Sequence, residues 1–174
     1  MIRKASILDL DAVAKIYDDI HTAEENGEII TGWARNVYPT KSTAEQALSN
    51  DELFVMENND IIVAAAIINQ KQVDSYKYCD WEFTADDSKV MVLHTLVISP
   101  YYSRKGFATE FVHFYENYAA KKGCTVLRID TQEKNKAART MYAKYGFREA
   151  GKSECVFNGI PGVKLVMLEK KVSL

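Results

Sequence analysis

The stretch VLHTLVISPYYSRKGFATEF, from Val92 to Phe111, decides the fold of this chain. Its first seven residues are almost all apolar or β-branched, which is typical of a strand that is buried on both faces. Pro100 ends this strand, and from Phe107 aromatic side chains recur at helical spacing until Gly123 stops the helix. The chain therefore passes from a central strand, through a short polar turn, into a helix.

Two helices and a hairpin are predicted before this stretch. Ser6-x-x-Asp9 has the pattern of a capping box at the start of the first helix, and Ser42-x-x-Glu45 has the same pattern for a shorter second helix. Residues 52–69 have the composition of two strands joined by a turn at 58–60. Residues 70–89 have weak periodicity, so we expect mostly loop.

After the central helix, residues 125–130 predict another strand. Asn135 can cap a further helix that Gly146 stops, and strands are expected near 147–150 and 163–169. Because strands and helices are interleaved and the hairpin is antiparallel, we predict an α/β fold with a mixed sheet.

Composition limits the possible functions. The chain has 174 residues, 47% of them hydrophobic, which predicts one globular domain over 1–174. Its net charge of −2 argues against a nucleic-acid partner. The three cysteines include no CxxC pair, so we expect neither a disulfide framework nor a metal site, and a cytoplasmic location. The longest apolar run, 61–68, is too short to span a membrane, and no membrane partner is expected.

Histidine spacing gives no further metal site. His21 and His113 are expected on helix surfaces, and no two histidines have the spacing of metal ligands.

The turn before the helix has the chemistry of an anion site. A helix N-terminus presents unpaired N–H groups and partial positive charge, and a glycine allows a ligand to approach the backbone. Gly106 lies at this point, with Ser103, Arg104 and Lys105 beside it. A phosphate or pyrophosphate is the expected ligand, although a merely tight turn explains the glycine equally well. Neither the Walker nor the dinucleotide glycine spacing is present.

Two blocks, TLVISPYYSRKGFATEF and VLRIDTQEKNKAARTMYAKYGF, together resemble the GNAT-type N-acetyltransferases. The resemblance implies a central mixed, mostly antiparallel sheet with splayed central strands, flanked by about four helices. It also implies acetyl-CoA as the cofactor, with its pyrophosphate in the glycine turn and its pantetheine arm along the central strand. One departure is Ser103, which stands where the family usually has Gln or Arg. The cofactor-binding residues that the resemblance implies are Leu96, Val97, Ile98, Ser103, Arg104, Lys105, Gly106, Phe107, Ala108, Thr109, Asn135 and Ala138.

The resemblance also suggests catalytic roles. Tyr142 is expected to protonate the departing thiolate, although its spacing also fits core packing. Many family members carry a basic glutamate where this chain has Val92, so His94, two residues further on the same strand face, is the candidate base. A hydrogen-bonded core histidine, or a water as the base, remains the alternative.

The acceptor site is predicted from a segment that covers it in the family. Trp33, Arg35 and Tyr38 lie in this segment, and Asp130 ends a strand beside the cofactor helix. Aromatic walls suit an amine through cation–π attraction, and Arg35 suits a substrate carboxylate. Loop anchoring by Trp33 and Tyr38, and loop capping by Asp130, are the structural alternatives.

The resemblance implies an enzyme that transfers acetyl from acetyl-CoA to a primary amine, and the expected acceptor is a small amine or an amino-acid-like metabolite. Direct attack is expected, because no cysteine has a visible partner base for a covalent intermediate. Open alternatives are a protein N-terminal acetyltransferase, a non-catalytic acyl-CoA sensor, and a phosphate-ligand enzyme of unrelated chemistry. The resemblance suggests a homodimer.

Overall fold

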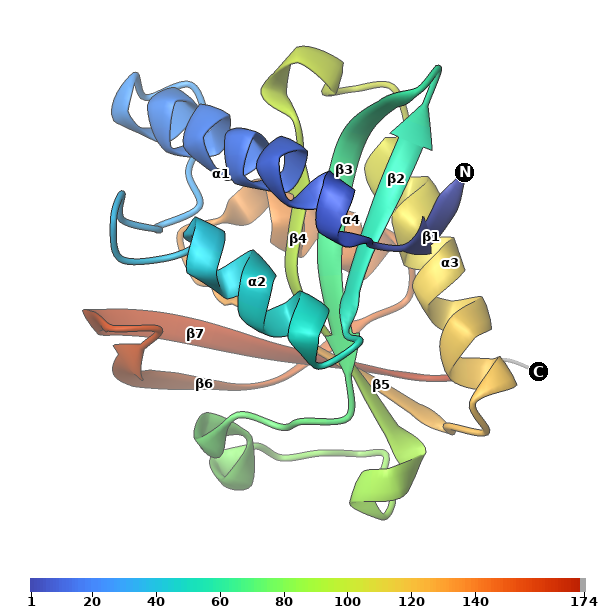
Figure 1. Ribbon diagram of the computed structural model, residues 1–174. Coiled ribbons are helices and arrows are strands. Elements are labelled where there is room, and N and C mark those ends of the chain that lie inside the picture. Colours follow the sequence, from blue (N-terminus) through green and yellow to red (C-terminus); the bar gives the residue numbers. More distant parts are fainter. Residues whose placement is uncertain (173–174) are drawn as a thin grey trace. The chain divides into compact units, whose positions relative to one another are not determined.

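The computed structural model describes residues 1–172 and has a seven-stranded sheet in the order β1-β2-β3-β4-β5-β7-β6 (Figure 1). The strands are β1 (Ile2–Lys4), β2 (Leu53–Asn58), β3 (Ile61–Asn69), β4 (Val90–Ile98), β5 (Val126–Gln132), β6 (Arg148–Phe157) and β7 (Ile160–Lys171). β4 and β5 pair in parallel, whereas β1–β2, β2–β3, β5–β7 and β6–β7 pair antiparallel. The predicted mixed, mostly antiparallel sheet is confirmed; the splay of its central strands stays a prediction.

Four α-helices accompany the sheet, as predicted. They are α1 (Leu10–Glu25), α2 (Lys41–Ser49), α3 (Phe107–Lys121) and α4 (Lys136–Lys144). Short 3-10 turns complete the elements: η1 (Ile7–Asp9), η2 (Asp74–Tyr78), η3 (Asp87–Lys89) and η4 (Pro100–Tyr102). No helix within residues 1–172 has the length and apolarity needed to cross a membrane.

The chain divides by its contacts into two compact units. Unit 1 comprises Met1–Ile29, Trp33–Ile68 and His94–Tyr115. Unit 2 comprises Ile30–Gly32, Asn69–Leu93 and the chain from Glu116 onward. β4 therefore contributes its first four residues to unit 2 and its last five to unit 1.

In unit 1, the predicted capping box of Ser6 and Asp9 starts the 3-10 turn η1, which runs directly into α1. The backbone N–H of Ser6 donates to Oδ2 of Asp9 at 2.7 Å, and the Arg3 guanidinium pairs with the same carboxylate at 2.8 Å. The hydrogen bond from Arg3 is the main cause that lowers the pKa of Asp9 to about 2. α1 and α2 then pack apolar side chains against β2 and β3 (Figure 1).

Three details of the sequence prediction are wrong. The second helix begins two residues earlier than expected, with Thr40 and Thr43 forming its capping box in place of Ser42 and Glu45, because the Thr40 backbone is extended and precedes the first helical residue. His21 is buried, 5% exposed, with Nε2 lying 2.9 Å from the carbonyl oxygen of Pro39. His113 is exposed, as expected.

The third correction is the C-terminal hairpin, which is much longer than the two short strands predicted. β6 runs to Phe157 and β7 begins at Ile160, joined by a tight turn. Asn158 and Gly159 both take left-handed backbone angles, φ +51° and +77°, which a two-residue turn requires. The exposed, polar side chains of this hairpin hide its strand pattern from the sequence.

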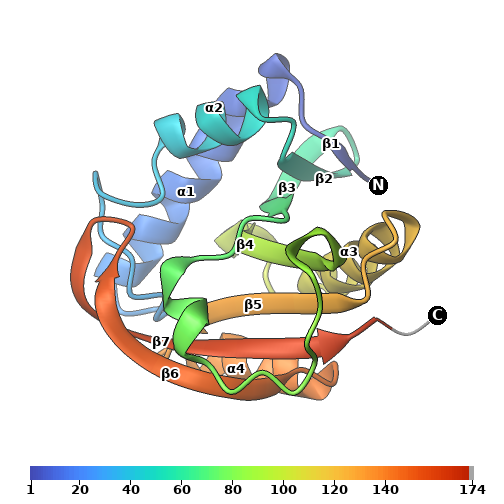
Figure 2. The same ribbon diagram turned by 90° about the horizontal axis from the view of Figure 1, so that it is seen from below.

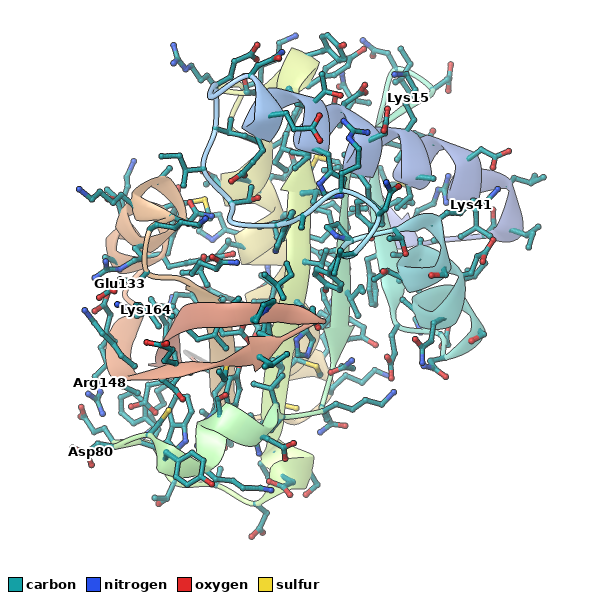
Figure 3. All side chains as sticks on the ribbon, turned by 90° about the vertical axis from the view of Figure 1, so that its left-hand side faces the viewer. Lys15, Lys41, Asp80, Glu133, Arg148 and Lys164 are labelled. Carbon is teal, nitrogen blue, oxygen red and sulfur yellow. The ribbon has the colours of Figure 1, made fainter. Side chains whose placement is uncertain are left out.

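Unit 2 has its own core, beneath the β3–β4 connection. Figure 2 shows β7 between β5 and β6, and their apolar side chains pack with Tyr76 of that connection. The connection is also hydrogen-bonded to a charged residue of the sheet. The carboxylate of buried Glu169 accepts hydrogen bonds from the backbone N–H groups of Glu82 and Phe83 at 2.8 and 3.2 Å. Figure 3 labels Arg148, whose Nη2 donates to the carbonyl oxygen of Asp80 at 2.7 Å.

Candidate active site

The turn between β4 and α3 requires a glycine for its backbone conformation. Arg104 and Gly106 both take left-handed angles, φ +61° and +84°. A Cβ placed on Gly106 would meet no atom within 4 Å, so the space in front of this backbone is open. Only the conformation, and not crowding by the protein, excludes a side chain here, and the open space can take a ligand.

The start of α3 supplies hydrogen-bond donors toward this turn. The N–H of Glu110 makes the first helical bond, to the Gly106 carbonyl oxygen at 3.0 Å. The N–H groups of residues 107–109 precede that bond, as in the first turn of any helix. Ser103, Arg104 and Lys105 are exposed around them. This arrangement fits an anion such as a phosphate or pyrophosphate better than an apolar ligand.

One cation of the turn is partly held by an aromatic ring. Nζ of Lys105 lies 4.9 Å from the centroid of the Tyr102 ring, a cation–π distance. Tyr102 in turn belongs to η4, whose backbone is fixed by the bond from the Tyr102 N–H to the Ser99 carbonyl oxygen at 2.8 Å. The Lys105 ammonium is therefore held near the turn by a ring whose backbone is itself hydrogen-bonded in place.

The second half of β4 carries an unusual backbone angle. Thr95 has φ +50°, although it is β-branched and lies inside a strand. Such an angle is an outlier for this residue type and is typical of functional or strongly constrained positions. The strand is fully buried from Val90 to Leu93 but only half-buried at His94, Thr95 and Leu96. Leu96, Val97 and Ile98 follow this irregularity, and Val97 points into the core of unit 1.

Tyr38 fixes the irregular residue. Its hydroxyl is hydrogen-bonded to the Thr95 hydroxyl, and its ring lies edge-on to Trp33 with centroids 6.0 Å apart. Trp33 packs against the core of unit 1. The Tyr38 hydroxyl is therefore bonded to the central strand β4, and the Trp33 ring packs against the Tyr38 ring.

The Arg35 side chain forms ion pairs and hydrogen bonds with residues of helix α1. Its guanidinium bonds Glu25 at 2.7 Å and also pairs with the Asp18 carboxylate. The Thr22 hydroxyl accepts a third bond, at 2.8 Å. These partners give Arg35 a loop-anchoring role that needs no substrate carboxylate.

Asp130 and Tyr142 are electrostatically coupled in unit 2. The Tyr142 ring is buried against Phe147, with centroids 5.7 Å apart. Burial raises the pKa of the Tyr142 hydroxyl above its usual value, and the negative charge of Asp130 raises it further. Burial also raises the pKa of the Asp130 carboxyl to about 6, against the opposing effect of a hydrogen bond from Tyr76.

Asn135 acts as the cap that the sequence predicted. Its Oδ1 accepts the N–H of Ala138 at 3.1 Å, which fixes the first turn of α4. Its amide NH₂ remains available for contact with a ligand.

Two residues of this region were missed from the sequence. Tyr76, which donates to Asp130 at 2.8 Å, lies in a connection expected to be loop. Gln132, whose Nε2 donates to the Gly32 carbonyl oxygen at 2.7 Å, follows Asp130 on β5. Alternation along β5 could have placed Gln132 on the face of Asp130, but no local signal identifies the partners of either residue.

Comparisons with known proteins agree with this geometry. The model of the acetyltransferase (GNAT) family matches residues 11–147. No curated protein matches the sequence. A GNAT-family acetyltransferase from Streptococcus agalactiae 2603 has a TM-score of 0.80 at 19% identity, covering 100% of this chain and 96% of its own.

Two further solved structures share the fold at lower TM-scores. The ribosomal-protein-S18-alanine N-acetyltransferase of Escherichia coli has a TM-score of 0.70 at 17% identity, covering 100% of this chain and 94% of its own. A Salmonella typhimurium protein solved with its cofactor acetyl-CoA has a TM-score of 0.69 at 16% identity, covering 99% and 94%. At these identities the likeness shows the fold alone. Because the family model spans well over half of the sequence, the chain belongs to the acetyltransferase (GNAT) family.

Proposed function

We propose that this protein transfers the acetyl group of acetyl-CoA to a primary amine of a small, amino-acid-like acceptor. The observation that carries the proposal is the turn at Gly106, with its left-handed backbone, its open space and its position at the start of α3 in a GNAT chain. The thioester supplies an activated acetyl group, and the amine attacks it directly.

The chain offers a continuous set of cofactor contacts. The N–H groups of Phe107, Ala108 and Thr109 bind the pyrophosphate, with charge from Arg104 and Lys105. The backbone of residues 96–98 holds the pantetheine arm, beyond the irregular angle at Thr95.

Tyr142 is the proposed acid. Its raised pKa keeps the hydroxyl protonated at neutral pH, so that it holds a proton for the departing thiolate. The negative charge of Asp130 supports this protonated state, and Asp130 itself is proposed to face the acceptor amine.

His94 is the proposed base. It lies half-buried on β4, directly before Thr95. Val92, at the position where many family members carry a glutamate, is fully buried in the core of unit 2 and has no proton-accepting atom. A rate–pH profile in which His94→Gln removes the acidic limb supports this role, and an unchanged profile rejects it.

A non-catalytic acyl-CoA sensor is the second candidate, and the buried Val92 is the observation that favours it. Turnover separates the two. An enzyme releases coenzyme A thiol when an amine is added, whereas a sensor binds acetyl-CoA and releases none with any amine.

The first experiment is thermal unfolding with acetyl-CoA, desulfo-coenzyme A or ADP, each titrated separately. A ligand at about 100 times its dissociation constant stabilises the folded state by about 2.7 kcal/mol. Stabilisation by both coenzyme A compounds, with ADP much weaker, supports the glycine turn and the strand groove and leads to a screen of amines. If calorimetry confirms that no ligand binds, the turn is only a tight connection and the proposal fails.

A further inference from the structure

Two connections that lie far apart in the sequence are tied to neighbouring positions on β5. The Tyr76 hydroxyl, from the β3–β4 connection, donates to Oδ2 of Asp130 at 2.8 Å. Two residues along the strand, Nε2 of Gln132 donates to the carbonyl oxygen of Gly32, from the α1–α2 connection, at 2.7 Å. Asp130 and Gln132 share one face of β5, because strand side chains alternate. All four residues belong to unit 2.

The contact between Gln132 and Gly32 is specific. Gln132 is 8% exposed and Gly32 is buried, so an amide left unpaired there is costly. Gly32 has φ +82°, and a Cβ on it would lie 1.9 Å from Oε1 of Gln132. The backbone therefore approaches the amide more closely than any side chain at position 32 allows. One end of the contact requires glycine, and the other requires a side-chain donor.

This contact ties the short segment Ile30–Gly32 to β5, two residues along the strand from Asp130. The segment is assigned to unit 2, although the chain on both sides of it belongs to unit 1. Asp130 as a residue keeps some solvent exposure, although its carboxyl lies deep enough for burial to raise its pKa, and within residues 1–172 Tyr76 is the one side chain described as donating to it. An acceptor amine can therefore approach the Asp130 carboxylate from this face of β5. On the same face, the next side chain, Gln132, holds the segment Ile30–Gly32.

We propose that Gln132 and Gly32 are positioning residues that hold Ile30–Gly32 as one wall of the acceptor subsite at Asp130. The wall sets the affinity for the acceptor and has no part in binding acetyl-CoA. The inference rests on the proposed function, in which Asp130 faces the amine.

The kinetic test uses Gln132→Met, which keeps the side-chain length and removes the donor. Gln70→Met is the matched control, because Nε2 of Gln70 also donates to a backbone carbonyl, that of Ser88, at 2.6 Å. We expect KM for the acceptor to rise about tenfold in Gln132→Met, the usual effect of one lost hydrogen bond. KM for acetyl-CoA should stay within about twofold in both variants. An unchanged acceptor KM, or an equal rise in both constants, overturns the proposal.

A second test needs no turnover. The wall keeps water from Asp130, so removing its anchor should lower the pKa of that carboxyl from about 6 toward its ordinary value, measured by carboxyl NMR titration. Gln70→Met should leave the titration unchanged, and an unchanged titration in Gln132→Met overturns the proposal. If Gln132→Met does not fold, Gln132→Leu tests the same bond, because leucine has no donor and adds no charge near Asp130. If the wild type acetylates no amine, the proposed function fails. The NMR titration of Asp130 then tests by itself whether Gln132 holds the segment Ile30–Gly32 over that carboxyl.

Discussion

The hydroxyl of Tyr76 donates a 2.8 Å hydrogen bond to the carboxylate of Asp130. Burial raises the pKa of this carboxyl to about 6, and the hydrogen bond opposes the rise because it stabilises the ionised form. Tyr76 itself is 2% exposed, and it supports the packing of Trp81, whose ring centroid lies 5.3 Å away. The pair therefore joins the core of unit 2 to a titrating group of the candidate site.

Tyr76→Phe should raise the pKa of Asp130 above its wild-type value, because the ring remains and only the donor is lost. Carboxyl NMR titration measures this shift directly. Tyr78→Phe is the control: Tyr78 lies in the same 3-10 turn but is 84% exposed. A shift of the same size in the control, or a fall in the pKa for Tyr76→Phe, contradicts the role of the bond.

Asp130→Asn should make the protein more stable at pH 7. The folded pKa of Asp130 is above its unfolded value of 3.8, so the native state binds more protons between the two values and loses stability as pH rises from about 4 to about 6. Removing the charge removes this loss, which is worth at most about 3 kcal/mol. Urea unfolding at pH 4 and pH 7 measures it.

The matched control for this prediction is Asp86→Asn, an exposed carboxylate of the β3–β4 connection. It should unfold like the wild type at both pH values. If Asp130→Asn is less stable than the wild type at pH 7, the carboxylate makes favourable contacts that outweigh its burial.

Gly106→Ala should weaken acetyl-CoA binding more than it weakens the fold. The left-handed backbone costs any L-residue about 1 kcal/mol of folding stability. Gly27→Ala is a close control, because Gly27 has φ +73° and, like Gly106, open space around a built Cβ. We expect equal losses in thermal stability, and about a tenfold or larger loss of acetyl-CoA affinity by calorimetry in Gly106→Ala alone. Equal affinities in the two variants would remove the evidence for the turn as a ligand site.

Much of the fold could be predicted, because it depends on local signals. Ser6 and Asp9 form the predicted capping box, Asn135 caps α4, and the turn of the β2–β3 hairpin lies at Asn59 and Asp60 as expected. These features follow from short-range hydrogen bonding and backbone preference, which the sequence records directly.

The parts that could not be predicted depend on long-range partners. His21 has helical spacing that also fits the surface, and only the carbonyl oxygen of Pro39 explains its burial. Arg35 stays a candidate for a substrate carboxylate, but no local signal in the sequence predicts its ion pairs with Asp18 and Glu25 of α1. Tyr76 and Gln132 carry no motif, since each acts through a residue more than 50 positions away.

Tyr142→Phe should lower turnover and leave acetyl-CoA affinity unchanged. The phenylalanine ring keeps the contact with Phe147, so folding stability should change little. Loss of a general acid slows the reaction by about 10²–10⁴-fold. Tyr145→Phe, at the C-cap of the same helix, should turn over at the wild-type rate. An unchanged rate for Tyr142→Phe would return this residue to a packing role.

The most destabilising change predicted in unit 2 is at Glu169, which is completely buried at the centre of a charged cluster. Its carboxylate pairs with Arg148 at 2.7 Å and accepts the N–H groups of Glu82 and Phe83. Arg128, opposite Glu169 in the β5–β7 register, lies 3.9 Å from the centroid of the Trp81 ring. Residues 80–83 are thereby held on the sheet by three charged side chains.

Glu169→Leu should lower the free energy of unfolding by about 3 kcal/mol, because it removes the buried carboxylate that pairs with Arg148 and leaves two backbone N–H groups without their acceptor. Amide hydrogen exchange should increase in residues 80–83, while the β2–β3 hairpin of unit 1 keeps its protection. Glu154→Leu is the control, since Glu154 is exposed on the neighbouring strand β6 and should change stability little. If Glu169→Leu is as stable as the wild type, apolar packing replaces the charged cluster, as it can in other buried ion pairs, and the connection is held by Tyr76 and Trp81 instead.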